Sequence, residues 1–287
     1  MLSIHLSRIV IIEVTVMKLD ICQQSYSLQW GGTYYFALTD YPNIKAWELE
    51  KLAAFCAYEK WNHRQTDISC QDSKLLEEVH QFLEAHACAY PFRPSCKLVA
   101  STFNINGEAV CCPYLSHTCT VAAALSIFKT GRLLSAVRAF GVTAQELARS
   151  DRNAAGDPAD YFHYVMLGWS NTTSGYRLAM ERLLNRMPNE KDLREHFVPG
   201  VSFHYSYSDI CQMKGYVFDG YHPAKIKDEL SLEELQACII PKSWQQRFEA
   251  VIPKALRSKI HYLDYRGEGL VEWSDRVYQL LRVISDS

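Results

Sequence analysis

The sequence lacks the short motifs that mark several large enzyme classes. It contains no G-x-G-x-x-G or G-x-x-x-x-G-K-[ST] phosphate loop, no H-E-x-x-H helix and no G-x-S-x-G turn. It also lacks a C-x-x-C pair, and Cys111 and Cys112 are adjacent, so its 10 cysteines form no zinc-binding pattern. A dinucleotide-binding Rossmann site, a P-loop, a zinc protease and an α/β-hydrolase are therefore not indicated, and no metal is expected.

An excess of positive charge is absent too. The 30 Lys and Arg residues are balanced by 32 Asp and Glu residues, which gives a net charge of −2. This net charge does not indicate nucleic acid or an anionic membrane as a partner, although a local basic groove is compatible with it. With 287 residues, 48% of them hydrophobic, the chain suits one large or two modest domains with a sizeable core.

The N-terminus lacks the features of a secretion signal. Glu13 interrupts the apolar run MLSIHLSRIVIIEVTV, no small-residue cleavage site follows, and the run is too short and polar to cross a membrane. We expect an extra strand here, or an extension that precedes an alternative translation start at Met17. Cysteines in apolar contexts, such as Cys56, Cys88 and Cys238, indicate structural thiols in a reducing, cytoplasmic compartment.

Strands and helices follow one another without a regular βαβ alternation, which predicts an α+β fold. A hairpin is predicted over residues 26–38, around the turn pair Gly31-Gly32. Helices are predicted over residues 44–61, 72–87, 143–150, 174–184, 243–252 and 269–283. Strands are predicted over residues 96–102, 108–116, 161–169, 201–207, 215–221 and 259–265. The two prolines of the loop AYPFRPS predict a boundary between an N-terminal α+β cap or subdomain, residues 1–95, and a second domain, residues 96–287.

The stretch LSHTCTVAAALSIFKTGRLLSA, residues 115–136, predicts a strand, a helix and a second extended segment. Thr118 or Thr120 can cap the helix, and Gly131 can end it in a left-handed conformation. The junction places His117 beside free backbone N–H groups and the positive end of a helix dipole, which suits an anionic ligand. The apolar residues of the helix recur at i, i+3, i+4 and i+7, namely Val121, Ala124, Leu125 and Phe128.

Three pieces of the sequence carry a family resemblance. They are HTCTVAAALSIFKTGRLLSA with its His-Thr pair, NAAGDPADYFHYVML with an Asp-Tyr after a polar loop, and the acidic residue of KIKDEL. In this order they resemble the NAD-dependent ADP-ribosyltransferases of the His-Tyr-Glu type, and among these the DarT-type toxins that ADP-ribosylate DNA bases. The likeness covers roughly residues 110–245 and implies a split antiparallel sheet core with an N-terminal α+β extension.

The resemblance implies a role for each matching residue, with NAD as the substrate. His117 is expected to hydrogen-bond the nicotinamide-side ribose with Thr118 beside it, and Tyr161 or Tyr164 to pack the nicotinamide ring. Glu229 is expected to hold a ribose hydroxyl and to stabilise the positive charge that develops as nicotinamide leaves. The arginine that contacts NAD is matched first by Arg152 and second by Arg138.

These roles fit the chemistry of the bond that breaks. A preorganised carboxylate stabilises an oxocarbenium-like centre in a water-poor site, a tyrosine face stacks on an aromatic ring, and arginine makes bidentate contacts to pyrophosphate. The segment after Glu229 is shorter than the strand usual in the family, so Glu233 and Glu234 are further candidates for the carboxylate. The toxins' Pro-rich substrate loop is missing, so the acceptor stays open between a DNA or RNA base and a protein side chain.

Other interpretations of the same residues remain. The tyrosines alternate as in a half-buried strand, and the charged run KIKDEL is typical of a solvated face. His222 and Asp219 form a further polar group near aromatic residues, and Cys119 near His117 would suit a Cys-His hydrolase.

The alternative functions are a non-catalytic binding module of the same fold, possible in a toxin-like or phage-defence setting with an antitoxin-like partner, and an RNA 2′-phosphotransferase or NAD hydrolase. No membrane partner is expected.

Overall fold

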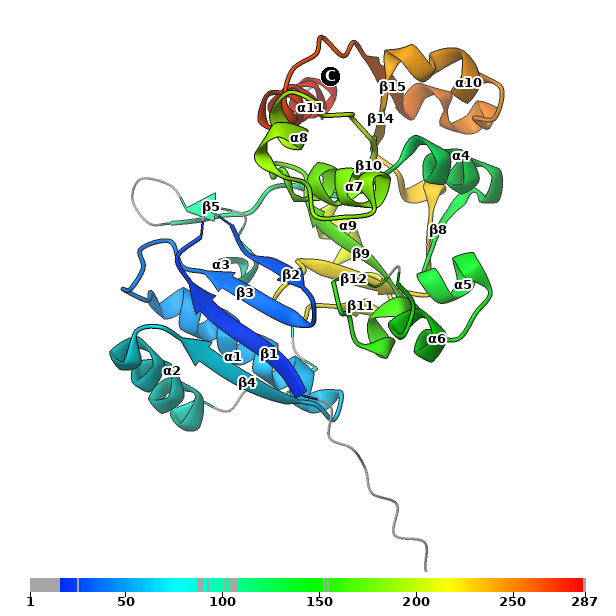
Figure 1. Ribbon diagram of the computed structural model, residues 1–287. Helices are drawn as coiled ribbons and strands as arrows, with labels where there is room; N and C mark the ends of the chain where they lie inside the picture. Colours follow the sequence, from blue (N-terminus) through cyan, green and yellow to red (C-terminus); the bar gives the residue numbers. More distant parts are fainter. Residues whose placement is uncertain are drawn as a thin grey trace, which may run out of the picture.

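The computed structural model describes residues 16–24, 26–86, 90–91, 93–100, 102–103, 108–151, 153 and 155–285. The expected N-terminal strand, Cys88 and Arg152 lie outside these residues, as do residues 104–107 between two of the expected strands. Two sheets organise the chain, a small one near the N-terminus and a larger one that the rest of the chain builds (Figure 1). The molecule is a mixed α+β protein, as predicted. Among the described residues, no helix combines the length and apolar character needed to cross a membrane.

The small sheet has four strands in the order β2-β3-β1-β4. The strands are β1 (Val16–Cys22), β2 (Leu28–Trp30), β3 (Thr33–Ala37) and β4 (Gln65–Cys70). β2 and β3 form the predicted antiparallel hairpin around Gly31-Gly32, whereas β1 runs parallel to both β3 and β4. Side chains alternate along β1, so that Leu19 and Ile21 enter a core that is shared with the helices.

Two helices cover one face of this sheet, α1 (Ala46–Trp61) and α2 (Ser73–Ala85). Both confirm helices predicted from the apolar periodicity. The carboxylate of Asp72 accepts the N–H of Leu75 at 2.9 Å and caps α2, as expected for a side chain that satisfies an otherwise unpaired donor.

The large sheet has seven strands in the order β11-β12-β9-β7-β10-β14-β15. Neighbouring strands are antiparallel except β14 and β15, which are parallel. The strands are β7 (Tyr114–Cys119), β9 (Tyr164–Trp169), β10 (Val201–Ser206), β11 (Tyr216–Val217), β12 (Ala224–Lys227), β14 (Ala237–Pro241) and β15 (Ile260–Leu263). A regular parallel sheet is thereby excluded for these strands.

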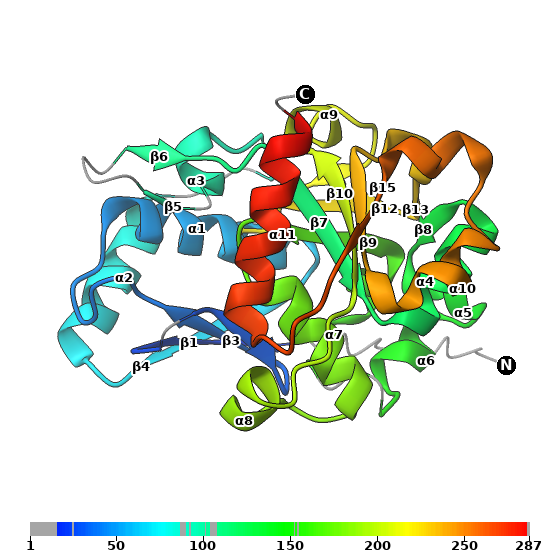
Figure 2. The ribbon, with the colours of Figure 1, turned by 90° about the horizontal axis from the view of Figure 1, so that it is seen from above.

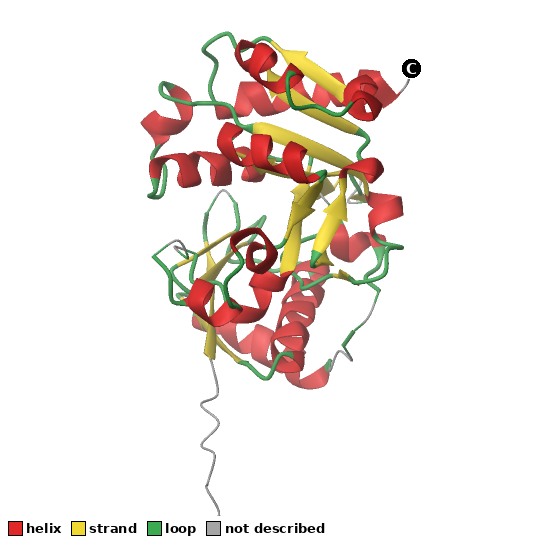
Figure 3. Cartoon of the chain, turned by 90° about the vertical axis from the view of Figure 1, so that its right-hand side faces the viewer, coloured by secondary structure: helices red, strands yellow, loops and turns green. Residues whose placement is uncertain are grey.

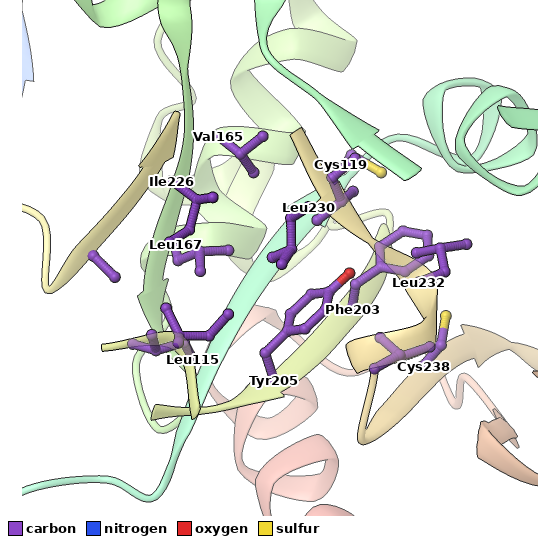
Figure 4. Close-up of a cluster of buried hydrophobic side chains, with 14 of the residues drawn as sticks. Leu115, Cys119, Val165, Leu167, Phe203, Tyr205, Ile226, Leu230, Leu232 and Cys238 are labelled. Carbon is purple, nitrogen blue, oxygen red and sulfur yellow. The ribbon is translucent and has the colours of Figure 1, made fainter. Parts of the chain in front are cut away.

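One face of the large sheet carries the main apolar core (Figure 4). Leu115, Leu167, Phe203 and Ile226 point into it from four neighbouring strands, and Leu230 closes it from above. Leu230 belongs to a separate two-stranded ribbon of β8 (Arg132–Leu134) and β13 (Glu229–Ser231). The helices on this side are α4 (Val121–Thr130), α5 (Ala136–Phe140), α6 (Ala144–Ala148) and α10 (Gln245–Glu249).

The predicted strand–helix–strand unit around His117 is present. The hydroxyl of Thr120, one of the two expected caps, accepts the N–H of Ala123 at 3.3 Å and starts α4. Gly131 ends the helix with φ of 69°, a conformation that costs little only for glycine, and β8 follows directly. β8 pairs with β13 in a separate two-stranded ribbon and not with β7, the strand from which the unit started.

The opposite face is covered partly by α7 (Ser174–Leu184) and α11 (Leu270–Ser285), which pack on β14 through Tyr176, Trp273 and Val277 (Figure 2). The remaining part meets α1 of the small sheet. Helices thus flank both sheets (Figure 3). The remaining short elements are α3 (Cys96–Val99), α8 (Glu190–Arg194), α9 (Tyr207–Ile210), β5 (Thr102–Phe103) and β6 (Ala109–Val110). Single 3-10 turns span Ala159–His163, Leu232–Glu234, Lys242–Trp244 and Lys254–Lys259.

The strand expected over residues 108–116 is interrupted at residues 111–113, and the one expected over residues 215–221 is limited to β11. Two other predicted strands are replaced in part by helical turns. Residues 96–99 form the short helix α3, because the Ser95 hydroxyl accepts the N–H of Leu98 and caps a helical turn. Residues 159–163 form a 3-10 turn and β9 begins only at Tyr164, because Asp160 and Tyr161 are held by side chains of α1. Contacts between distant segments override the local preference in the second case.

Candidate functional site

The strands β7 and β9 separate beside His117. They pair only through Leu115 with Trp169 and Ser116 with Gly168, whereas β7 pairs with β10 along its whole length. At the next position the Nδ1 atom of His117 lies 3.3 Å from the carbonyl oxygen of Met166. The imidazole therefore fills the place where the backbone ladder stops.

The contact defines the hydrogen-bonding character of His117. A carbonyl oxygen can only accept, so Nδ1 carries the proton and donates it to Met166. Burial lowers the pKa of His117, and this hydrogen bond opposes the shift only in part. A neutral ring of this tautomer presents Nε2 as a hydrogen-bond acceptor, which suits a hydroxyl group of a ligand.

Thr118, the neighbour of His117, faces the other side of the sheet. The strand register pairs His117 with Phe203 of the main core, and Thr118 with the buried Ser202 on the opposite face. Thr118 packs on α7, where a Cβ atom added to Gly175 would lie 2.6 Å from the Thr118 hydroxyl oxygen. The structure therefore does not bring Thr118 and His117 to a common surface.

Glu229, on the β8–β13 ribbon, lies between two arginines. Its carboxylate is 2.5 Å from Nη1 of Arg138 on α5 and forms a second ion pair with Arg132 on β8. We call these three residues the Glu229 cluster. About half of each arginine side chain is exposed. The structure thus brings together two of the predicted residues, Glu229 and Arg138, and adds Arg132, which sequence reasoning missed.

The backbone of Asp228 holds the Glu229 cluster in place. Its N–H donates to the carbonyl of His163 at 2.8 Å, and its carbonyl accepts the N–H of Ser135 at 2.7 Å. Asp228 has φ of 68°, an uncommon value for a residue other than glycine, and this turn redirects the chain from β12 into β13. Leu230 then enters the same apolar core as Leu115, which precedes His117 by two positions on one face of β7.

Tyr161 and Tyr164 lie elsewhere. Tyr161 is fully buried, its hydroxyl is 3.4 Å from Glu59, and its ring centroid is 3.7 Å from the ammonium nitrogen of Lys225. The ring centroid of Tyr164 lies 5.1 Å from the same nitrogen. Register places Tyr164 and Lys225 on the face of the sheet opposite to His117. The structure does not bring either tyrosine to the His117 side.

Lys225 is the centre of a buried polar group; the sequence indicated two of its members, Asp219 and His222, but not Lys225 or Tyr58. Its ammonium donates to the Tyr58 hydroxyl at 2.7 Å and to the Asp219 carboxylate at 2.9 Å. His222 Nδ1 lies 2.9 Å from the same carboxylate. Burial disfavours ionised Asp219, but the charges of Lys225 and His222 outweigh it and hold its pKa well below the usual range. We call Lys225, Asp219, His222 and Tyr58 the Lys225 cluster.

A second set of charged side chains extends this cluster into the small-sheet unit. Arg64 is paired with Glu59 at the end of α1 and with Asp160, and the Tyr58 hydroxyl donates to Asp160 at 2.9 Å. Tyr58 and Arg64 lie about 100 positions from Asp160 in the sequence, and Tyr58 lies 167 positions from Lys225, so no local pattern could have indicated these contacts. The fully paired contacts make this region a structural junction between the two sheets.

Neither the Glu229 cluster nor the Lys225 cluster forms a metal site. Within the parts of the chain that the structure describes, no group of three or more His, Cys, Asp or Glu side chains is arranged to hold a metal ion. The Asp219–His222 pair is taken up by Lys225, and Cys119 is buried with a pKa raised to about 12 by burial, which disfavours a thiolate nucleophile.

No family model matches the sequence, and neither a curated protein nor a solved structure matches it.

Proposed function

We propose that this protein transfers ADP-ribose from NAD to a macromolecular acceptor and releases nicotinamide. The observation that carries the proposal is the Glu229 cluster, in which one carboxylate is held by two half-exposed arginines. The cluster is built on β8, the last strand of the unit that begins at His117. The proposal brings this carboxylate, its two arginines and the neutral His117 to one substrate, because these are the groups that a dinucleotide with a labile glycosidic bond requires.

The proposed reaction assigns a role to each of four residues. Arg132 and Arg138 turn from Glu229 to the pyrophosphate of NAD, since guanidinium groups bind phosphate oxygens with bidentate geometry. Glu229, released from its ion pairs, stabilises the positive charge on the ribose as the bond to nicotinamide breaks. The Nε2 atom of His117 accepts a hydrogen bond from a ribose hydroxyl. The acceptor then attacks the ribose carbon, and its proton passes to the Glu229 carboxylate.

The proposal also specifies a fold and leaves one role unassigned. The separation of β7 and β9 beside His117 supports the split-sheet core of ADP-ribosyltransferases. No part in NAD binding is assigned to Tyr161 or Tyr164, because both pack against Lys225. Arg152 stays a prediction from the sequence.

A second candidate is a non-catalytic module that binds an anion. It is favoured by the same ion pairs, because a carboxylate neutralised by two arginines is not available for catalysis until an anion displaces it. Release of free nicotinamide distinguishes these functions. A transferase releases nicotinamide from NAD only when its acceptor is present, an NAD hydrolase releases it without one, and a binding module releases none.

The decisive experiment uses NAD labelled in its adenosine half. The purified protein is mixed with labelled NAD and cell extract, with and without nuclease, and both free nicotinamide and bound label are measured. Label that disappears after nuclease treatment identifies a nucleic-acid acceptor, as the toxin likeness favours. Label that survives identifies a protein acceptor, as the near-neutral charge favours. NAD binding without nicotinamide release supports the binding module instead.

A further inference from the structure

Two cysteines lie against each other where the chain passes from α3 to the large sheet. Cys96 is the first residue of α3, and Cys111 lies between β6 and β7. Their sulfur atoms are 2.8 Å apart, closer than two non-bonded sulfur atoms normally approach, and the Cys111 sulfur is also 3.5 Å from the Cys96 carbonyl oxygen. We propose that Cys96 and Cys111 are a redox-active pair that forms a reversible disulfide. This inference is independent of any reaction with NAD.

The pair is accessible to reagents through Cys96. The Cys96 side chain is exposed and Cys111 is partly buried. Cys112, Cys119 and Cys238 are buried. An oxidant or a reducing dithiol can therefore reach Cys96 first.

The neighbouring thiols are directed elsewhere. Cys112 follows Cys111 in the chain, but its sulfur is 3.6 Å from the Tyr278 hydroxyl on α11. Cys211 is also near Tyr207, whose pKa is raised in part by Cys211 and by both cysteines of the pair, but the Cys211 sulfur donates to the Ser208 carbonyl at 3.3 Å. The geometry thus selects Cys96 and Cys111 among several nearby cysteines.

Hydrogen peroxide is the oxidant that completes the reaction. The thiolate of Cys96 attacks one peroxide oxygen, the O–O bond breaks, and sulfenic acid and one water form. The Cys111 sulfur then attacks the Cys96 sulfur, and the hydroxyl group leaves as a second water with the proton of the Cys111 thiol. In total two thiols and one peroxide give one disulfide and two waters. Burial, together with the neighbouring Cys96, raises the pKa of Cys111 to about 12, so Cys96 is the first nucleophile.

The disulfide would tie the segment that connects the two sheets. α3 packs against α1 of the small-sheet unit and against β6, and Cys111 leads directly into β7. Closing the ring from residue 96 to residue 111 restricts the unfolded chain, so oxidation should raise the melting temperature of the protein. Reduction by dithiothreitol should reverse the shift.

The test is disulfide mapping of the full-length protein. The reduced protein is treated with hydrogen peroxide, blocked with N-ethylmaleimide and digested with trypsin, which cleaves after Lys97 and separates the two cysteines. We expect one cross-linked peptide pair, lighter by two hydrogen atoms than the two reduced peptides and absent after dithiothreitol. The same two peptides also contain Cys88, Cys112 and Cys119, so Cys88→Ser, Cys112→Ser and Cys119→Ser are measured as well, and the link should persist in all three.

The variants supply the controls. Cys96→Ser and Cys111→Ser should each lose the cross-linked pair, whereas Cys211→Ser, which changes the nearby thiol outside the pair, should keep it. Circular dichroism of the reduced variants verifies that they fold, and loss of maleimide labelling at Cys96 and Cys111 in parallel gives the same answer in the unchanged protein. Sulfinic acid at Cys96 without a link, a link to Cys112, or a link between two molecules would each overturn the proposal.

Discussion

The ammonium of Lys225 and the carboxylate of Asp219 lie 2.9 Å apart, and neither side chain is exposed to solvent. The rings of Tyr58 and Tyr161 flank the ammonium at 4.0 and 3.7 Å. A buried ion pair contributes little net stability compared with an apolar pair, but removing one partner leaves the other charge buried and alone. This pair therefore governs how the large sheet tolerates substitution at its junction with α1.

Lys225→Met should destabilise the protein by about 3–5 kcal/mol, because Asp219 then keeps a buried charge without its partner. Urea denaturation gives this free energy. Lys227→Met provides the control, since Lys227 lies two positions along the same strand and is exposed, and it should change stability by less than about 0.5 kcal/mol. Equal effects of the two variants would contradict the role given to the pair.

His204 should make stability fall as the pH falls below neutrality. Burial lowers its pKa to about 3, and its ring nitrogens contact the Ser170 and Ser202 hydroxyls. In the unfolded chain a histidine binds a proton below about pH 6.5. Between these two pKa values the unfolded state holds the extra proton, so stability decreases by at most about 1.4 kcal/mol per pH unit of acidification.

The variant His204→Gln removes this titration. The decrease in unfolding free energy between about pH 7 and about pH 5 should become smaller by about 2 kcal/mol in the variant. Urea denaturation at both pH values measures it. The comparison uses the slope and not the absolute stability, because the substitution also disturbs the hydroxyl contacts. An unchanged slope would mean that His204 is protonated in the folded protein.

Gly220→Ala should weaken the junction between the two sheets. Gly220 has φ of 81°, and a Cβ atom there would lie 2.4 Å from the backbone nitrogen of Phe55 on α1. Backbone cannot move aside as a flexible side chain does, so we expect a loss of about 2–4 kcal/mol from overpacking and strain. Gly141→Ala has a similar φ but open space around it and should cost only about 1 kcal/mol. The melting temperatures of the two variants measure this difference in stability.

Glu229→Gln should lower kcat for ADP-ribosyl transfer at least about 100-fold, because the substitution removes the charge that stabilises the transition state. The fold should remain, since the change conserves volume. His117→Ala should raise KM for NAD and lower kcat, because its hydrogen bond acts in both the bound substrate and the transition state. Nicotinamide release measures both.

The exposed Glu84 on α2 supplies the matched control, and Glu84→Gln should keep full activity. Glu233→Gln and Glu234→Gln are measured in parallel. Should one of these abolish transfer while Glu229→Gln retains it, the catalytic carboxylate has been assigned to the wrong residue.

Local chemistry predicted those parts of the fold that depend on neighbours in the sequence. The caps at Asp72 and Thr120 and the left-handed Gly131 are decided within a few residues, and all three are present. The strand expected to start at Tyr161 is a 3-10 turn for its first three residues, because Tyr58 of α1 and Arg64, which follows α1, hold Asp160. No pattern within residues 159–163 contains that information.

The same distinction applies to the candidate site. Glu229 and Arg138 were singled out by resemblance and meet in the structure, whereas Arg132 joins them only because β8 pairs with β13. Lys225 was part of a charged run that is normally solvated, yet it is fully buried. Its only local indication is the alternation of lysine with apolar residues in AKIK, which places Lys225 and Lys227 on one strand face.

The contact between Lys225 and Tyr58 joins residues 167 positions apart, and this has a consequence during synthesis. A ribosome adds about 5–20 residues per second, so about 8–30 seconds pass between the appearance of α1 and that of its partner strand. Throughout that interval Tyr58 and Glu59 at the end of α1, and Arg64 just after it, have no large sheet to meet. A nascent chain interrupted before Asp219 would leave this polar and aromatic surface exposed to solvent.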